Sequence, residues 1–81
     1  MSCELLEQID KLHTTPMGIE RIKRNLKLDD IDVVDYCKQI VLDLNATISR
    51  QGKNWYVRLS DIVLTINAYS YTIITAHLQK R

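Results

Sequence analysis

The second half of the sequence interleaves apolar residues with residues that can bind phosphate or move a proton. Arginine carries a planar guanidinium that matches phosphate oxygens, while tyrosine and histidine can transfer protons or contact nucleobases. Threonine and asparagine can hydrogen-bond to a nucleic-acid backbone. On a shared surface, Arg58 would stabilise phosphate charge while His77 or Tyr56 moves a proton. The alternating polar positions are Tyr56, Arg58, Thr65, Asn67, Thr75 and His77.

These residues lie on expected β-strands, because the apolar period beyond Asn45 is two. The strands are expected at about 46–50, 55–59, 62–67 and 71–78. Their short connections favour antiparallel neighbours, since parallel strands need a long crossover. Side chains then alternate between the two sheet faces, with the apolar set directed at a core and the polar set directed at solvent.

The last strand leaves its orientation open, because Ile73 and Ile74 are adjacent apolar residues. If Ile74, Ala76 and Leu78 point to the core, alternation adds three residues to the polar face. Those residues are Tyr71, Thr75 and His77.

The first half of the sequence predicts three helices, at about 3–12, 16–27 and 30–43. Thr15 is expected to cap the second helix with Pro16 at its first position, and Asp29 or Asp30 is expected to cap the third. The fold class is therefore α+β, one domain over residues 1–81. In this fold N-terminal helices pack on one face of a four-stranded antiparallel β-meander.

Basic residues follow the solvent side of the second predicted helix at Arg21, Lys23, Arg24 and Lys27. They can contact a nucleic-acid backbone or an acidic partner, although a solvated helix face is the commoner explanation of such a pattern. Alignment with Lys53 and the polar sheet face would favour the functional interpretation. We expect Arg21, Arg24 and Lys53, together with Thr65, Asn67 and Thr75, to bind the ligand.

Composition and charge exclude several classes of protein. The chain is 46% hydrophobic and 26% charged, which is typical of a globular domain. It lacks the ~20-residue apolar run of a membrane span, and its N-terminus is acidic where a signal peptide is basic, so a cytoplasmic location is expected. Residues 1–44 carry a net charge of −3 and residues 45–81 a net charge of +4.

Metal and cofactor sites are not expected. The cysteines and histidines lack the spacing of zinc ligands, and no glycine-rich phosphate loop is present. Cys37 lies on an apolar helical stripe and is expected to be a buried core residue. His13 is expected to lie at a helix end, where a cation offsets the helix dipole.

Three stretches, His13–Ile22, Gly52–Val57 and Ala68–His77, resemble a small bacterial family known as the DUF3781 domain, over nearly the whole chain. The architecture is more loosely similar to RelE-like and barnase-like ribonuclease toxins, in which a polar sheet face holds RNA. That similarity implies RNA-contacting roles for Tyr56, Arg58, Thr75 and His77, with Arg21 or Arg24 from the helix. The chain departs from those toxins in its net charge of +1 and in lacking their catalytic motifs.

Two functional hypotheses follow. In the first, the exposed sheet face binds RNA or another phosphate-bearing ligand, with or without cleaving it as a toxin paired with an antitoxin would. In the second, the chain is a non-catalytic interaction module, a phage or defence accessory or a homodimer. Its exposed final strand, Thr72–Leu78, would then pair with a partner or a second copy.

Overall fold

The computed structural model describes residues 4–28 and 31–79. Helical segments come first and four strands follow, so the predicted α+β class is confirmed. The helical segments are α1 (Glu4–Glu7), the 3-10 helix η1 (Ile9–Lys11), α2 (Pro16–Leu26) and α3 (Val33–Leu42). The strands are β1 (Thr47–Gln51), β2 (Asn54–Leu59), β3 (Ile62–Asn67) and β4 (Ile73–Leu78).

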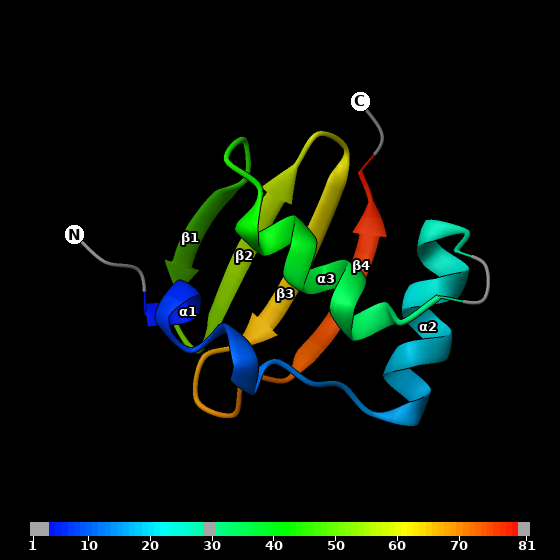
Figure 1. Ribbon diagram of the computed structural model, residues 1–81, viewed down its shortest axis with the longest axis horizontal. Helices are drawn as coiled ribbons and strands as arrows, with labels where there is room; N and C mark the ends of the chain where they lie inside the picture. Colours follow the sequence, from blue (N-terminus) through cyan, green and yellow to red (C-terminus); the bar gives the residue numbers. More distant parts are fainter. Residues whose placement is uncertain (1–3, 29–30, 80–81) are drawn as a thin grey trace.

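The strands form one antiparallel sheet in the order β1-β2-β3-β4, as expected for a meander. Val57 lies opposite Ile48 on one side and Leu64 on the other, and Leu64 lies opposite Ala76. Directly opposed residues in a sheet project from the same face, so this row crosses the sheet towards the helices. In Figure 1, α1 and α3 lie over the near face of the sheet, while α2 lies beside β4.

The core lies between that sheet face and the helices. Each helix contributes an apolar stripe, and the strands contribute alternate residues, as the sequence period predicts. The buried helix residues include Ile22, Leu26, Val33, Cys37, Ile40 and Val41. The buried strand residues that face them include Trp55, Val57, Leu64, Ile66, Ile73 and Ala76.

The N-terminal segment differs from the single helix predicted at 3–12. One helical turn ends at Glu7, and a 3-10 turn follows at Ile9–Lys11. Leu5 and Leu12 are nevertheless buried, so the apolar stripe reaches the core from two short turns. A ten-residue helix has little stability of its own, and packing contacts therefore decide its conformation.

The N-terminal caps of α2 and α3 differ in how well the sequence predicts them. Thr15 caps α2 as predicted, because its Oγ1 accepts a hydrogen bond of 3.0 Å from the Gly18 amide. The predicted caps of α3, Asp29 and Asp30, lie outside the described residues. Asp32 caps α3 instead by accepting from the Asp35 amide at 3.1 Å. An acidic run offers several possible caps, and the position of the apolar stripe on the sheet selects one.

The last strand contains an irregularity that alternation cannot predict. Thr75 lies opposite Thr65, but Ile73 rather than Ile74 lies opposite Ile66, so the β3–β4 pairing shifts by one residue. Ile73 and Ala76 are buried, whereas Ile74 is 40% exposed. Of the three residues in the inward-facing alternative, only Ala76 is buried, because Ile74 and Leu78 are both exposed.

The same irregularity changes the position of Tyr71. This residue precedes β4, has a left-handed backbone with φ of 57°, and is buried. Its ring packs against Trp55 with 5.3 Å between ring centroids. Tyr71 therefore does not join the polar sheet face, which the sequence allowed for one orientation of the last strand, because the turn before the strand directs the ring into the core.

The outer edge of β4 is covered. The Asn25 side chain on α2 donates to the Ala76 carbonyl at 3.1 Å. Thr14 Oγ1 donates to the Ile73 carbonyl at 2.9 Å, and the Ile73 amide donates to the His13 carbonyl at 2.7 Å. Thr72–Leu78 is therefore not the free edge that strand pairing with a partner requires. The helix and the preceding segment, which sequence pattern could not place, cover it.

The turn between β1 and β2 depends on glycine at position 52. Gly52 has φ of +60°, and an added Cβ would have nothing within 4 Å. A substitution there therefore measures backbone strain alone.

We expect Gly52→Ala to lower the free energy of unfolding by about 1 kcal/mol, the cost of a left-handed conformation for a residue with a Cβ. Urea unfolding followed by circular dichroism measures this. Gly52→Asn is the matched control and should lose less, because asparagine tolerates that conformation. An alanine variant as stable as the wild type would contradict the strained-turn assignment.

Cys37 is fully buried on α3, which confirms the predicted core position. Desolvation by burial raises the pKa of its thiol from 9.0 to about 12. Above pH 9 the unfolded chain therefore releases this proton while the folded chain retains it. The stability contributed by the buried neutral thiol is complete below pH 9 and is lost as the pH rises towards 12.

We expect the wild type to lose about 1.4 kcal/mol per pH unit from this group above pH 9. Cys37→Ala lacks the group, so the stability of the variant relative to the wild type should improve by about 2 kcal/mol between pH 8 and 10.5. Urea unfolding of both proteins across this range isolates the thiol, because every other titrating group is shared. A constant difference would show that the thiol ionises equally in both states.

Candidate functional site

The second face of the sheet carries the residues that the alternation predicted. Tyr56 lies opposite Ser49 and Thr65, and Thr65 lies opposite Thr75. Because these positions alternate with the buried ones, their side chains project away from the helices. Within the described ranges, the helices lie over the other face or beside β4, so no helix covers this one (Figure 1). We call it the open face.

Arg58 and His77 lie in the next row of the open face. Each is directly opposite Val63, on strands that flank β3. Their Cα atoms are therefore about 10 Å apart, twice the spacing of neighbouring strands. Both side chains are exposed, and neither has a hydrogen-bond or ion-pair partner among the described residues. The two long side chains can thus reach a common group above Val63.

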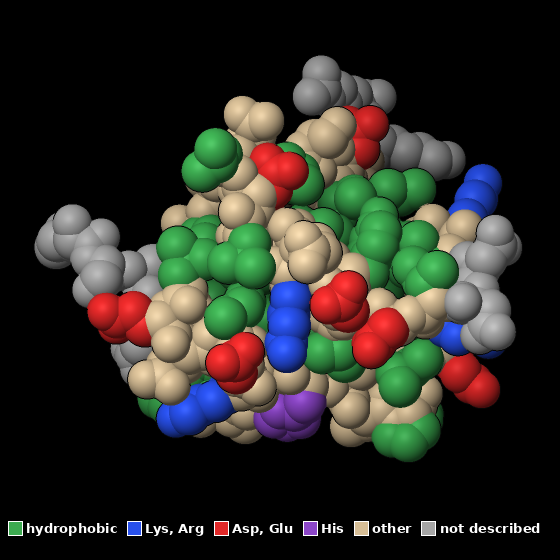
Figure 2. Space-filling model, viewed as in Figure 1, with side chains coloured by type: hydrophobic (Ala, Val, Ile, Leu, Met, Phe, Trp, Pro, Cys, Tyr) green, Lys and Arg blue, Asp and Glu red, His purple; other side chains and the backbone are tan. Residues whose placement is uncertain are grey.

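The charge on the two sides of the molecule differs. Acidic side chains are spread over the helix side, as Figure 2 shows. In residues 45–79 the single acid is Asp61, in the turn between β2 and β3. Neither the row containing Tyr56 nor the row containing Arg58 includes a carboxylate. The open face is therefore polar and locally basic, although the net charge of the chain is only +1.

The predicted helix bases lie at the edge of the sheet and not on the open face. Arg21 and Arg24 line a shallow pocket on α2 with Met17, Glu20 and Asn25. The bond from Asn25 to Ala76 places this pocket beside β4. Two strands, β3 and β4, therefore separate these arginines from β2, which carries Arg58.

Lys53 and Asn67 lie at the opposite end of the sheet from Arg58. Asn67 pairs with Asn54, which is about 13 Å along β2 from Arg58 at 3.3 Å per residue. The Asn67 Oδ1 accepts hydrogen bonds of 2.9 Å from the amides of Tyr69 and Ser70, so it holds the loop between β3 and β4. Lys53 is exposed in the first turn, and its carbonyl accepts from the Ala68 amide. These two predicted ligand residues do not join the Arg58 row.

The loop end of the sheet also gathers cations and aromatic rings. The Arg50 guanidinium lies 5.6 Å from the Trp55 ring centroid and 5.8 Å from that of Tyr69. The Lys11 ammonium lies 5.5 Å from the Tyr71 ring centroid. Trp55 is buried whereas Tyr69 is 71% exposed, so the two aromatics do not form a shared exposed anchor of the kind that would favour the interaction hypothesis.

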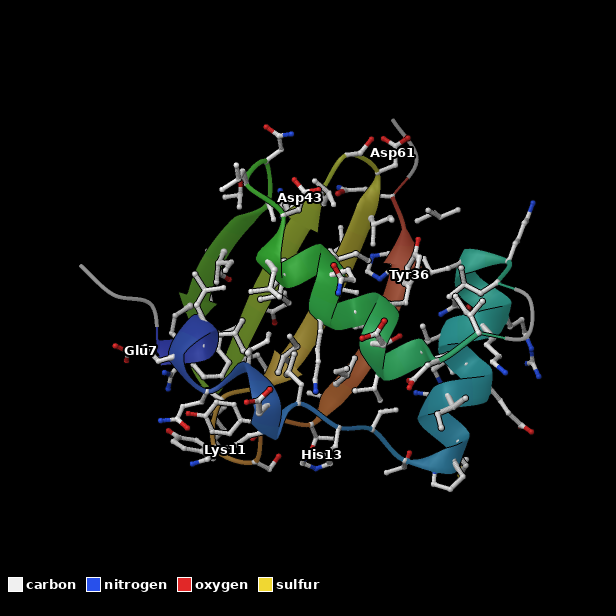
Figure 3. All side chains as sticks on the ribbon, viewed as in Figure 1. Glu7, Lys11, His13, Tyr36, Asp43 and Asp61 are labelled. Atoms are coloured by element: carbon white, nitrogen blue, oxygen red, sulfur yellow. The ribbon has the colours of Figure 1, made fainter. Side chains whose placement is uncertain are left out.

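Sequence pattern missed one cluster at this end. His13 Nε2 lies 3.0 Å from Thr72 Oγ1, and Thr72 Oγ1 lies 2.7 Å from Ser70 Oγ. His13 Nδ1 contacts the carbonyl of Lys11, the last residue of η1, which confirms that His13 lies at a helix end. His13 and Thr72 are 59 residues apart and meet through an isolated parallel bridge, which no local spacing reveals. Figure 3 shows His13 below the lower end of the sheet.

Residues 4–28 and 31–79 contain neither a metal-binding cluster nor a membrane-spanning helix. No group of three or more histidine, cysteine, aspartate or glutamate side chains is placed to hold a metal ion there. In the same residues, every helix is too short or too polar to cross a membrane.

Comparison with known proteins identifies the family of the chain. No curated protein and no solved structure matches the chain significantly. A family model covers residues 6–77, from α1 to the end of β4. The chain therefore belongs to the family described as a protein of unknown function, DUF3781.

Proposed function

We propose that the open face binds RNA through its phosphodiester backbone. The observation that carries the proposal is the placement of Arg58 and His77, neither of which has a partner among residues 4–28 and 31–79, on either side of Val63 on an uncovered sheet face. A guanidinium without a carboxylate partner is free to accept a phosphate as a bidentate ligand.

The neighbouring row supplies the other contacts that RNA requires. Tyr56, Thr65 and Thr75 lie side by side across three strands and are half-buried. Their hydroxyls can hydrogen-bond to phosphate oxygens or to the ribose 2′-hydroxyl, and the Tyr56 ring can stack on a base. A sheet surface of this kind suits single-stranded RNA, whose bases can be splayed out.

The local character of the charge determines how strong the binding can be. With a net charge of +1, long-range attraction to RNA is weak, so affinity depends on the few contacts of the open face. Arg21 and Arg24 line a pocket on α2 beside β4 and would contact a strand of RNA that crosses this edge. They extend the surface without belonging to its centre.

The same arrangement supports cleavage as an extension of the proposal. A ribose 2′-hydroxyl would attack the adjacent phosphorus and release the 5′-oxygen, forming a cyclic phosphate. Arg58 would stabilise the charge on the phosphate, and His77 or Tyr56 would carry the proton between the attacking and the leaving oxygen. The loose similarity to RelE-like and barnase-like toxins favours this reaction, and an antitoxin would then be the natural protein partner.

We expect Arg58→Ala to weaken binding of a fluorescein-labelled single-stranded RNA by about tenfold or more, because a phosphate-binding arginine is lost. Fluorescence anisotropy at fixed salt measures this. Lys38→Ala on α3 is the charge-matched control, because it removes one positive charge from the helix side of the molecule. Equal effects of the two variants, or no binding by the wild type, would contradict the proposal.

Cleavage is tested separately with total RNA. His77→Ala should leave RNA affinity within about threefold of wild type, because Arg58 still supplies the charged contact to the phosphate. It should lower the cleavage rate by about 100-fold, the usual contribution of a general acid or base. Wild-type protein that binds RNA without cleaving it would restrict the function to binding. Cleavage unchanged in both His77→Ala and Arg58→Ala would exclude the open face as the catalytic site.

A second candidate, a non-catalytic interaction module, is favoured by one observation. Leu42 is 50% exposed and Leu44 is fully exposed in the segment that leads into β1, the strand at the other edge of the sheet. Large exposed apolar side chains beside a strand edge favour pairing with a partner or a second copy. Size-exclusion chromatography distinguishes the two candidates, because a dimer dissociated by Leu44→Glu would favour the interaction module.

A further inference from the structure

Two hydroxyls and an imidazole form a continuous hydrogen-bonded chain at the loop end of the sheet. Ser70 Oγ lies 2.7 Å from Thr72 Oγ1, and Thr72 Oγ1 lies 3.0 Å from His13 Nε2. The other ring nitrogen, Nδ1, lies 2.9 Å from the Lys11 carbonyl oxygen. This cluster shares no residue with the open-face site proposed above.

The direction of the protons follows from the chemistry of these groups. In the neutral ring, a proton on His13 Nδ1 donates to the Lys11 carbonyl, which can only accept, and Nε2 then carries the lone pair. Thr72 must then donate its single proton to Nε2. The single Ser70 proton is then shared between two acceptors, Thr72 Oγ1 at 2.7 Å and Asn67 Oδ1 at 3.2 Å. A hydroxyl that donates to a neutral imidazole is the arrangement of an activated nucleophile.

The backbone holds the base and the hydroxyl in place. The His13 amide donates to the Tyr71 carbonyl at 3.2 Å, and the Ile73 amide donates to the His13 carbonyl at 2.7 Å. These two bonds flank Thr72. The Thr72 carbonyl in turn accepts from the Asn67 amide at 2.8 Å. The Lys11 carbonyl orients the His13 ring, and these backbone hydrogen bonds hold His13 and Thr72 together. Nucleophile–base pairs in enzymes are oriented by a third group in the same way.

The hydrogen-bonded side chains of Ser70, Thr72 and His13 are accessible from solvent. His13 and Ser70 are exposed and Thr72 is half-buried, so an electrophile can reach the hydroxyl from solvent. Buried polar groups must form hydrogen bonds within the protein, but exposed hydroxyls can bond to water instead. The hydrogen bonds among these three side chains are therefore not a simple result of burial. The pocket lined by Arg21 and Arg24 lies elsewhere, on α2. An open surface of this kind accommodates a small acyl group.

We propose that Thr72 is a nucleophile that accepts an acyl group from small activated esters, with His13 as its general base. Thr72 Oγ1 attacks the carbonyl carbon as its proton passes to His13 Nε2, and an O–C bond forms. The ester bond to the leaving alcohol then breaks, and His13 returns the proton to that oxygen. Water repeats the sequence on the acyl-threonine, releasing the carboxylic acid and restoring the hydroxyl.

The probe is p-nitrophenyl acetate, with nitrophenolate release followed by absorbance and the acetylated residue located by peptide mass spectrometry. We expect the acetyl group on Thr72. Thr72→Val should lower the initial rate by about 100-fold or more, and so should His13→Asn, in which the amide can still donate to the Lys11 carbonyl. Thr72→Ser should retain the activity, because it keeps the hydroxyl at the same position.

The matched control is Thr47→Val, which removes an exposed threonine hydroxyl on β1, outside the chain of hydrogen bonds. It should react at the wild-type rate. Circular dichroism establishes that each variant is folded before it is assayed. Acetylation confined to lysines, the N-terminus or Ser70 would overturn the assignment, as would wild-type rates in both Thr72→Val and His13→Asn.

Discussion

Packing of the helices on one side of the sheet is the constraint on which the rest of the structure depends. α3 lies over the central strands and buries Cys37 and Val41 against residues such as Val57 and Leu64. Burial of these side chains is the main source of stability available to a chain of this size. Because strand side chains alternate, the burial of one set determines that the other set is in solvent. The open face is thus a direct consequence of core formation, before any ligand is considered.

Much of the fold could be predicted from local pattern. The change of apolar period near Asn45, the short turns and the cap formed by Thr15 each depend on neighbouring residues only, and each is present as expected. The features that could not be predicted depend on the assembled sheet. The shift in pairing beside Ile74 and the burial of Tyr71 result from fitting the last strand to β3 while its preceding turn packs on Trp55.

In the candidate site, too, some features follow from local sequence pattern and others depend on the assembled fold. Alternation along single strands was enough to place Tyr56, Arg58 and Thr65 on one face. The helical period of α2 predicts which side of the helix is buried, but it does not predict which part of the sheet that side packs against. The position of α2 beside β4 could therefore not be predicted. For the same reason Arg21 and Arg24 lie at an edge. The chain from His13 to Ser70 depends on a contact between the two halves of the sequence, and no spacing within either half indicates it.

The extra residue in the last strand has a consequence for the chemistry of the open face. Counted strictly by twos from the buried Ile73, positions 75 and 77 would point to the interior. Insertion of Ile74 reverses the alternation, so that Ala76 enters the core and the threonine and imidazole beyond it emerge into water. Deletion of Ile74 would retain Thr75 and His77 in the sequence while turning both towards the interior. The number of residues in the last strand therefore matters as much as their identity for which side chains reach the open face.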